Sequence, residues 1–142
     1  MWAVHSILTN LVIVLIAISV FVDTHILSSK GNLGERSYGV MAGFCALALG
    51  VILVLANIFI GKIALGTAFD AGSVSPLLEE HKILVLLALV IFGILTLLQG
   101  FFLWFQRELN YRCGWGFVSF AWLGFMVVLL AAYYGNHLLY TN

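Results

Sequence analysis

The sequence predicts an all-α integral membrane protein, a four-helix transmembrane bundle. Of its 142 residues, 63% are hydrophobic and only 8% are charged, whereas soluble domains carry about 25% charged residues. So few charges cannot cover the surface of a soluble monomer, and a disordered chain would combine more charge with fewer apolar residues. The formal net charge is zero, so the excess of basic residues that nucleic-acid binding requires is missing.

Four long segments without Asp, Glu, Lys or Arg predict the positions of the helices. These segments are residues 1–22, 37–61, 83–106 and 113–142. A helix needs about 20 mainly apolar residues to cross the hydrocarbon core, and the segments are continuously apolar rather than alternating, as barrel strands would be. The expected helices cover residues 3–26, 38–60, 82–105 and 116–137, within a single transmembrane domain that comprises residues 1–142.

The positive charges between the helices predict the orientation in the membrane. Four of the six Lys and Arg residues follow the first and third helices: Lys30, Arg36, Arg107 and Arg112. The other two, Lys62 and Lys82, accompany the loop expected at residues 61–81. Under the positive-inside rule, this asymmetry places the first and third loops in the cytoplasm. We therefore expect a multi-pass protein of the inner (cytoplasmic) membrane, with both termini and the 61–81 loop on the outer, periplasmic side.

A seam of small residues on the second helix predicts close helix packing. Its members are Gly39, Gly43, Ala46, Gly50, Asn57 and Gly61. Steps of three, four and seven residues keep one helix face in register, and the Gly-x-x-x-Gly spacing at the start of the seam lets two helix backbones approach closely. The alternative is that this seam forms a groove for a substrate or cofactor.

Polar residues form a stripe on the first helix and another on the third. At about 100° per residue, His5, Thr9, Ser19 and Asp23 fall within one sector of the first helix. His81 and Gln99 lie eighteen residues, five helical turns, apart on the third. Polar groups are costly in lipid unless they face the interior of a bundle. We therefore expect both stripes to point inward and to form hydrogen bonds between helices.

Three of the four histidines are expected at one face of the membrane. His5 begins the first helix, His81 begins the third and His137 ends the fourth. Imidazoles ligate transition metals and haem iron, and bundles build cofactor sites from side chains on facing helices. These three histidines are therefore candidate ligands of haem b or of a metal whose identity is unknown. The alternative is that they are interfacial or packing residues, because no Cys-x-x-Cys-His or His-Glu-x-x-His motif accompanies them.

Short motifs along the whole chain resemble those of a known family. The segment from His5 through Asn10 and the apolar run that ends at Asp23 are similar to a His-Pro-x-x-Val-His-Phe-Pro-like start. His81 resembles a histidine at the start of the third helix, and residues 135–140 resemble a Gly-x-x-Leu-Val-Tyr-x-x-Gly-like end. The family is a bacterial four-helix integral membrane domain of unknown function.

The resemblance implies a membrane redox setting, because members of the family often occur beside or fused to cytochrome modules. It therefore implies haem as a candidate cofactor. The chain departs from the family pattern at three positions: Asn10 replaces the second histidine, and Ser6 and Val12 replace prolines. His5, His81 and His137 remain as the candidate ligands.

Three functions fit these observations. The first is a small non-catalytic accessory or structural subunit of a larger bacterial membrane complex, such as an electron-transfer complex, because the chain is short and carries no catalytic motif. Its partners would be the lipid bilayer and other membrane subunits or a cytochrome. The second is a b-type haem or quinone-linked redox module, with His5 and His81 as the preferred ligands. A small transporter ranks third, because no pair of acidic residues lies at mid-membrane.

Overall fold

The structure is a bundle of four long α-helices. The computed structural model describes residues 2–69 and 77–140, and within these residues all regular structure is helical: α1 (Trp2–Ser28), α2 (Tyr38–Phe69), α3 (Leu77–Phe105) and α4 (Tyr111–Tyr140). Each helix contains a stretch of 25 to 28 residues that is long and apolar enough to cross a membrane. The prediction of an all-α bundle of four membrane-spanning helices is therefore confirmed, and the chain is a multi-pass membrane protein.

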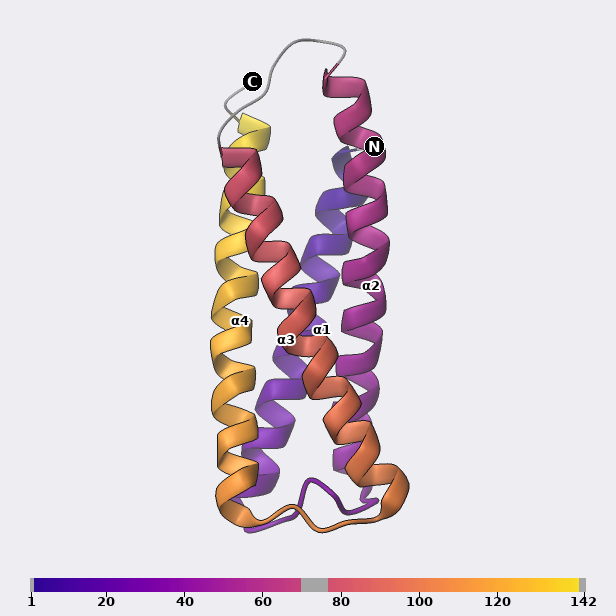
Figure 1. Cartoon of the computed structure of the whole chain (residues 1–142), viewed down its shortest axis with the longest axis vertical. Coiled ribbons are helices and arrows are strands. Elements are labelled where there is room, and N and C mark those ends of the chain that lie inside the picture. Colours follow the sequence, from indigo (N-terminus) through magenta and orange to yellow (C-terminus); the bar gives the residue numbers. More distant parts are fainter. Residues whose placement is uncertain (1, 70–76, 141–142) are drawn as a thin grey trace.

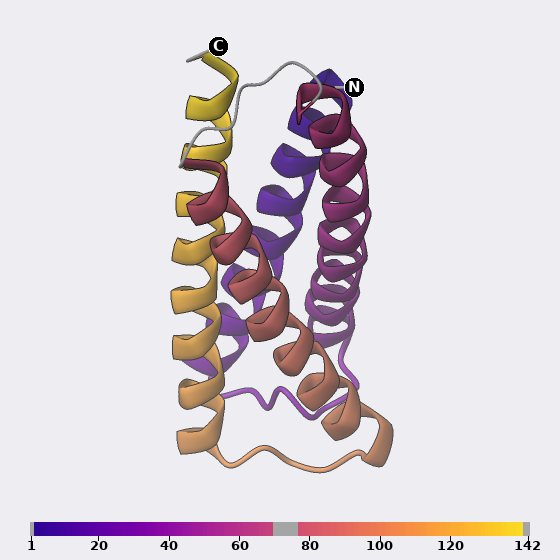
Figure 2. The same ribbon diagram turned by 45° about the horizontal axis from the view of Figure 1, so that its top comes forward.

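The helices run alternately up and down, so both chain ends lie at the same end of the bundle (Figure 1). We call this the termini end, and we call the opposite end, where the α1–α2 and α3–α4 connections lie, the loop end. α1 packs mainly on α2 and α3 on α4, with smaller α1–α4 and α2–α3 interfaces. At the termini end the α1–α2 pair and the α3–α4 pair stand apart (Figures 1 and 2).

The middle of the bundle is a dry core of interlocking apolar side chains. Its buried members are Val12, Ile16, Val20, Leu47, Val54, Ala88, Phe92, Leu95, Ala121 and Val128. The outward faces are apolar as well, and Leu97 and Trp104 are each 76% exposed. A soluble bundle would carry polar residues at such positions, so the outer surface of this bundle suits lipid rather than water.

The small-residue seam of α2 faces α1. A Cβ atom added at Gly43 would lie 3.0 Å from Oδ1 of Asp23, and one added at Gly50 would lie 3.1 Å from Cγ1 of Ile16. At the two ends of the seam, the nearest side chains to Gly39 and Gly61 also belong to α1. Backbone atoms of α2 therefore approach α1 closely, which is the role that small residues have in membrane helix pairs.

The helices are longer than the charge-free segments indicate. The loop expected at residues 61–81 is wrong at both ends, because α2 continues to Phe69 and α3 begins at Leu77. A charge marks where a span meets the membrane surface, but backbone hydrogen bonds can extend a helix beyond that point. α4 begins at Tyr111 rather than at residue 116, and Oδ1 of Asn110 caps it by accepting a hydrogen bond from the amide of Arg112 at 3.2 Å.

Two of the helices end in tight turns at the loop end. Lys30, which follows α1, has a φ of 59°, and the amides of Lys30 and Gly31 donate to the carbonyls of Leu27 and Ile26. This is the hydrogen-bond pattern of the Schellman motif. Gln106, which follows α3, has a φ of 49°. Both turns therefore place a residue other than glycine in the left-handed region.

Asn32 and Arg36 connect the two loops of the loop end. Oδ1 of Asn32 accepts hydrogen bonds from the amides of Gly34 and Leu109, each at 2.9 Å. Nε of Arg36 donates to the carbonyl of Leu103, in the last turn of α3, at 3.1 Å. These bonds join segments that are about seventy residues apart in the sequence. The loop end is thereby closed by polar contacts across the bundle.

Candidate functional site

A cavity of about 320 Å³ lies at the termini end, where the helix pairs stand apart. Its lining comes from α1 (His5), from α2 (Asn57, Ile58, Gly61 and Lys62) and from α3 (Leu78, His81, Lys82, Val85 and Leu86). Pockets for small ligands and cofactors commonly measure about 300–1,000 Å³ and combine an apolar wall with a few placed polar groups. The cavity has this size and this kind of lining.

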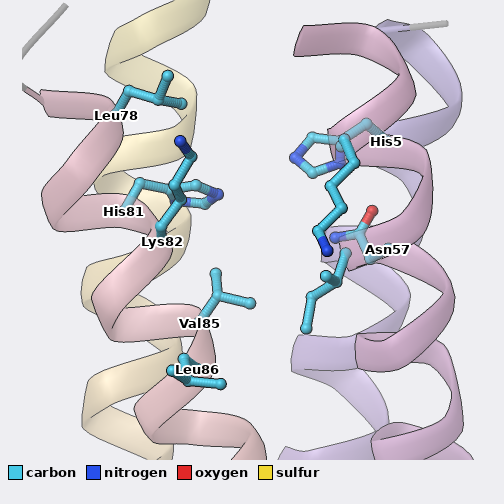
Figure 3. Close-up of a pocket in the computed structure, with 10 residues that line it drawn as sticks. His5, Asn57, Leu78, His81, Lys82, Val85 and Leu86 are labelled. Carbon is cyan, nitrogen blue, oxygen red and sulfur yellow. The ribbon is translucent and has the colours of Figure 1, made fainter. Parts of the chain in front are cut away.

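His5 and His81 face each other across the cavity (Figure 3). Their ring centres are 6.3 Å apart and their planes meet at 71°. Each ring rests against a glycine of the neighbouring helix: a Cβ added at Gly61 would lie 3.7 Å from Cε1 of His5, and one added at Gly135 would lie 2.9 Å from Cε1 of His81. Both imidazoles are thus seated on helix backbones and directed into the space between the helix pairs.

The orientation of the His81 ring is fixed by α4. Its Nδ1 lies 2.8 Å from the carbonyl oxygen of Ala131. A carbonyl oxygen can only accept a hydrogen bond, so Nδ1 carries the proton, and in a neutral imidazole Nε2 then keeps a free lone pair. Metal-ligating histidines in proteins show this arrangement, with one ring nitrogen bonded to a carbonyl or carboxylate.

Thr9 and Asn57 extend the site toward the bundle axis. Nδ2 of Asn57 donates to Oγ1 of Thr9 at 2.9 Å, and that hydroxyl donates to the carbonyl of His5 at 2.9 Å. A second, smaller cavity of about 40 Å³ shares Asn57, His81 and Val85 with the first. The polar stripe of α1 therefore points inward at this end, as predicted, and bonds to α2.

The three candidate histidines have different outcomes. The structure brings His5 and His81 together, whereas the side chain of His137 lies outside the part of the chain that the structure describes. The backbone of His137 belongs to α4 at the same end of the bundle. In residues 4–62 and 78–135, whose side chains the structure describes, no group of three or more His, Cys, Asp and Glu side chains is placed to hold a metal ion. The pair of imidazoles is therefore the arrangement that the described residues offer to a cofactor.

A second polar contact lies in the loop-end half of the bundle. Nε2 of Gln99 donates to Oδ1 of Asp23 at 3.3 Å. Both side chains are fully buried, as is Ser19, one turn from Asp23 on α1. The prediction that both stripes point inward and form hydrogen bonds between helices is confirmed here, and the structure shows that the partner of Asp23 on α1 is Gln99 on α3.

Sequence reasoning missed the backbone and cavity elements of the site. The backbone carbonyl of Ala131 bonds to His81, and the backbone at Gly61 and Gly135 leaves room for the two imidazole rings. No side-chain motif in the sequence reveals such backbone contacts. The sequence assigns Gly61 to the packing seam. Its spacing from Asn57 indicates that both residues lie on one face of α2, and in the structure this face is turned to His5. The cavity follows from the angle between the helix pairs, which composition and spacing do not encode.

The fold and the site define the class of the protein: a multi-pass helical membrane protein with an imidazole-lined cavity open between two helix pairs. In comparisons with protein-family models, curated proteins and solved structures, nothing matches the chain. The geometry of the site is therefore the basis for proposing a function.

Proposed function

We propose that the chain is a haem b-binding membrane protein with an electron-transfer role, in which the imidazoles of His5 and His81 would hold the haem iron. The observation that carries this proposal is the pair of imidazoles facing each other from α1 and α3, with ring centres 6.3 Å apart. Haem b would supply one-electron redox chemistry. The chain would supply the ligands, the apolar enclosure and the orientation.

The spacing of the two rings fits one metal between them. A bond from a metal to an imidazole nitrogen is about 2.0–2.1 Å, and the ring centre lies about 1 Å beyond that nitrogen, so two rings on opposite sides of a metal have centres about 6 Å apart. The hydrogen bond from Nδ1 of His81 to the carbonyl oxygen of Ala131 leaves the Nε2 lone pair of His81 available to a metal. With both imidazoles holding the iron, the haem would supply one-electron transfer chemistry.

The cavity wall suits a flat apolar ring. Ile58, Leu78, Val85 and Leu86 provide apolar surface on both sides of the opening. α2 and α3 lie on its two sides, and their outward faces suit lipid, so a hydrophobic cofactor could reach the histidines from within the membrane. Such a site needs no motif for covalent attachment.

The charge asymmetry of the sequence supports a location for this site. Four of the six Lys and Arg residues lie in the loop-end connections, which the positive-inside rule assigns to the cytoplasm. In a bacterial inner membrane, both termini and the histidine cavity would then lie toward the periplasm. A tag-accessibility assay at each terminus tests this orientation.

Absorption spectra of the purified protein test the haem proposal. The protein is expressed with ample haem supply, extracted in mild detergent and examined before and after reduction. We expect a Soret band that shifts on reduction, loss of the native spectrum in His5→Ala and His81→Ala, and an unchanged spectrum in His25→Ala, because His25 is exposed at the loop end. His137→Ala tests the third candidate histidine. A colourless wild-type protein, or native spectra in both cavity variants, would contradict the proposal.

A second candidate function is that of an accessory subunit in a larger membrane complex. Three phenylalanine rings cluster at the loop-end part of α3: the ring centre of Phe101 lies 5.8 Å from that of Phe102 and 4.7 Å from that of Phe105. Trp104 beside them is 76% exposed. Exposed aromatic residues are typical of interface anchors. A native gel of a mild-detergent extract tests this function: co-migration with larger subunits supports it, and migration as a single chain counts against it. The two functions are compatible in one protein.

A further inference from the structure

Both basic residues at the termini end line the histidine cavity. The chain has six Lys and Arg residues, of which four belong to the loop end. The remaining two, Lys62 on α2 and Lys82 on α3, are both exposed and both belong to the cavity wall. Figure 3 shows the Lys82 side chain extending along the cavity mouth toward the termini end. The positive charge of this end is therefore concentrated at one opening.

The two lysines have no acidic partner within the described residues. None of the described residues that line the cavity is acidic, although Glu79 and Glu80 occupy the first turn of α3 nearby. Lysines at the ends of membrane spans often extend to the polar surface. That tendency accounts for an exposed lysine at a span end, but it does not account for the placement of both lysines on the two facing walls of the same cavity.

We propose that Lys62 and Lys82 bind the two carboxylates of the cofactor that the histidines ligate, so that they select an apolar ring bearing anionic groups on one edge. This inference rests on the proposed function, with the haem propionates as the two carboxylates. The imidazoles would hold the iron, the apolar wall would hold the ring and the ammonium groups of the two lysines in the lining would hold the propionates. Charge-assisted hydrogen bonds from ammonium to carboxylate give such a contact its strength.

The arrangement also fixes which edge of the ring faces outward. Val85 and Leu86 lie deeper in the bundle than His81 and Lys82 (Figure 3), so the apolar edge would point toward the membrane interior. The propionate edge would point toward the polar surface, toward which the Lys82 side chain extends (Figure 3). An anionic edge placed the other way would meet the dry core, which is unfavourable for charge.

The experiment compares haem b with haem dimethyl ester, in which both carboxylates are blocked. Apo-protein in detergent is titrated with each, and binding is followed by the Soret band in the wild type, Lys62→Ala, Lys82→Ala and the double variant. Lys30→Ala, which removes a loop-end lysine, is the matched control. We expect the double variant to bind haem b about tenfold more weakly than the wild type, as two partly exposed charge pairs allow.

The two probes separate the lysine contribution from the histidine contribution. Affinity for the dimethyl ester should be the same in the wild type and in the lysine variants, and 1 M salt should reduce the advantage of haem b in the wild type. The position of the Soret band should not change in any lysine variant, because the imidazoles of His5 and His81 are intact. Lys62→Arg and Lys82→Arg should restore binding of haem b.

The outcomes distinguish failure of the lysine assignment from failure of the proposed haem binding. Equal affinity for haem b in the wild type and the double lysine variant, with loss of binding in His5→Ala and His81→Ala, overturns the lysine assignment and leaves the proposed function standing. A wild-type protein that binds neither probe overturns both. A double variant that loses haem b and the dimethyl ester alike shows damage to the cavity itself and also overturns the carboxylate assignment.

Discussion

The two ends of the bundle are made from the same four helices but are closed in different ways. At the loop end, Asn32 and Arg36 bond to segments about seventy residues away, and Asp23 is paired with Gln99 within the bundle. At the termini end, the helix pairs stand apart around a cavity of about 320 Å³ that His5 and His81 face. We call the loop end, which these hydrogen bonds join, the tied end, and the termini end, which holds the cavity, the open end.

This difference separates structural polar residues from candidate functional ones. In lipid, where apolar contacts between helices gain little over contacts with acyl chains, interhelical polar bonds and close packing hold helices together. The loop end uses polar residues in this way. The termini end instead places two imidazoles in the lining of a cavity between the helix pairs. Departures from good packing are expected at functional sites, and this supports our proposal that a cofactor binds at the open end.

The change with the largest expected effect is Gly34→Ala at the tied end. A Cβ atom at Gly34 would overlap the backbone carbonyl of Arg107, and a backbone atom cannot move aside as a flexible side chain can. We expect a loss of about 3 kcal/mol in the free energy of unfolding, at the upper end of the cost of overpacking. The measurement is unfolding in mixed micelles of mild detergent and sodium dodecyl sulfate, followed by circular dichroism.

Gly93→Ala is the matched control for this change. No atom lies within 4 Å of a Cβ added at Gly93, and alanine favours a helix over glycine by about 1 kcal/mol. This variant should therefore be as stable as the wild type or slightly more stable. Equal destabilisation by the two substitutions would mean that the contact between the loops does not hold the tied end closed.

The next largest effect is expected for Gln99→Leu. The substitution removes the amide that donates to Asp23 and leaves a buried carboxyl group without that partner. We expect a loss of about 1.5 kcal/mol, near the upper limit for an interhelical hydrogen bond in a membrane protein. Thr96→Val is the control, because the Thr96 hydroxyl donates within its own helix, to the carbonyl of Phe92 at 2.7 Å. If the control loses as much stability, the bond between α1 and α3 is not what matters.

At the tied end, the sequence predicts the helices better than it predicts the hydrogen bonds that join the two loops. Long charge-free segments predict four spans because lipid imposes a minimum length. The stripes that contain Asp23 and Gln99 predict inward-facing polar groups with bonds between helices, but not that these two residues are partners. The sequence does not single out Asn32, and it uses Arg36 only to predict orientation. Their partners are mostly backbone groups, and any segment can supply an amide or a carbonyl. Only the folded structure shows which ones come within reach.

At the open end the sequence predicts the ligand candidates but not the space around them. The sequence favours His5 and His81 as ligands because each begins an inward-facing polar stripe and both are expected near the same face of the membrane. Their pairing across a cavity depends on the angle between the helix pairs and on Gly61 and Gly135, which seat the rings. Lys62 and Lys82 were used only to predict orientation. Their shared position in the lining of the cavity emerges from the packing of α2 and α3.

A smaller effect is expected for Asn32→Ala. The substitution removes the oxygen that accepts from Gly34 and Leu109, but water at the end of the bundle can replace part of this bonding. We expect a loss of about 1 kcal/mol, the usual net value of a hydrogen bond, in the same unfolding measurement. Asn10→Ala, at an exposed position of α1, should cause no loss. A stable Asn32→Ala protein would show that the two loops are joined by other contacts.

The smallest effect is an expected gain, from Gln106→Gly. Gln106 has a φ of 49°, and a side chain in the left-handed region costs about 1–2 kcal/mol, while glycine costs the folded state about 0.5–1 kcal/mol more in chain entropy. The net gain should be about 0.5 kcal/mol. Gln106→Ala removes the same polar groups but keeps the Cβ atom, so it should show no gain. If both variants gain equally, the side chain rather than the backbone conformation limits the stability of this turn, and the tied end is not strained at the point where α3 ends.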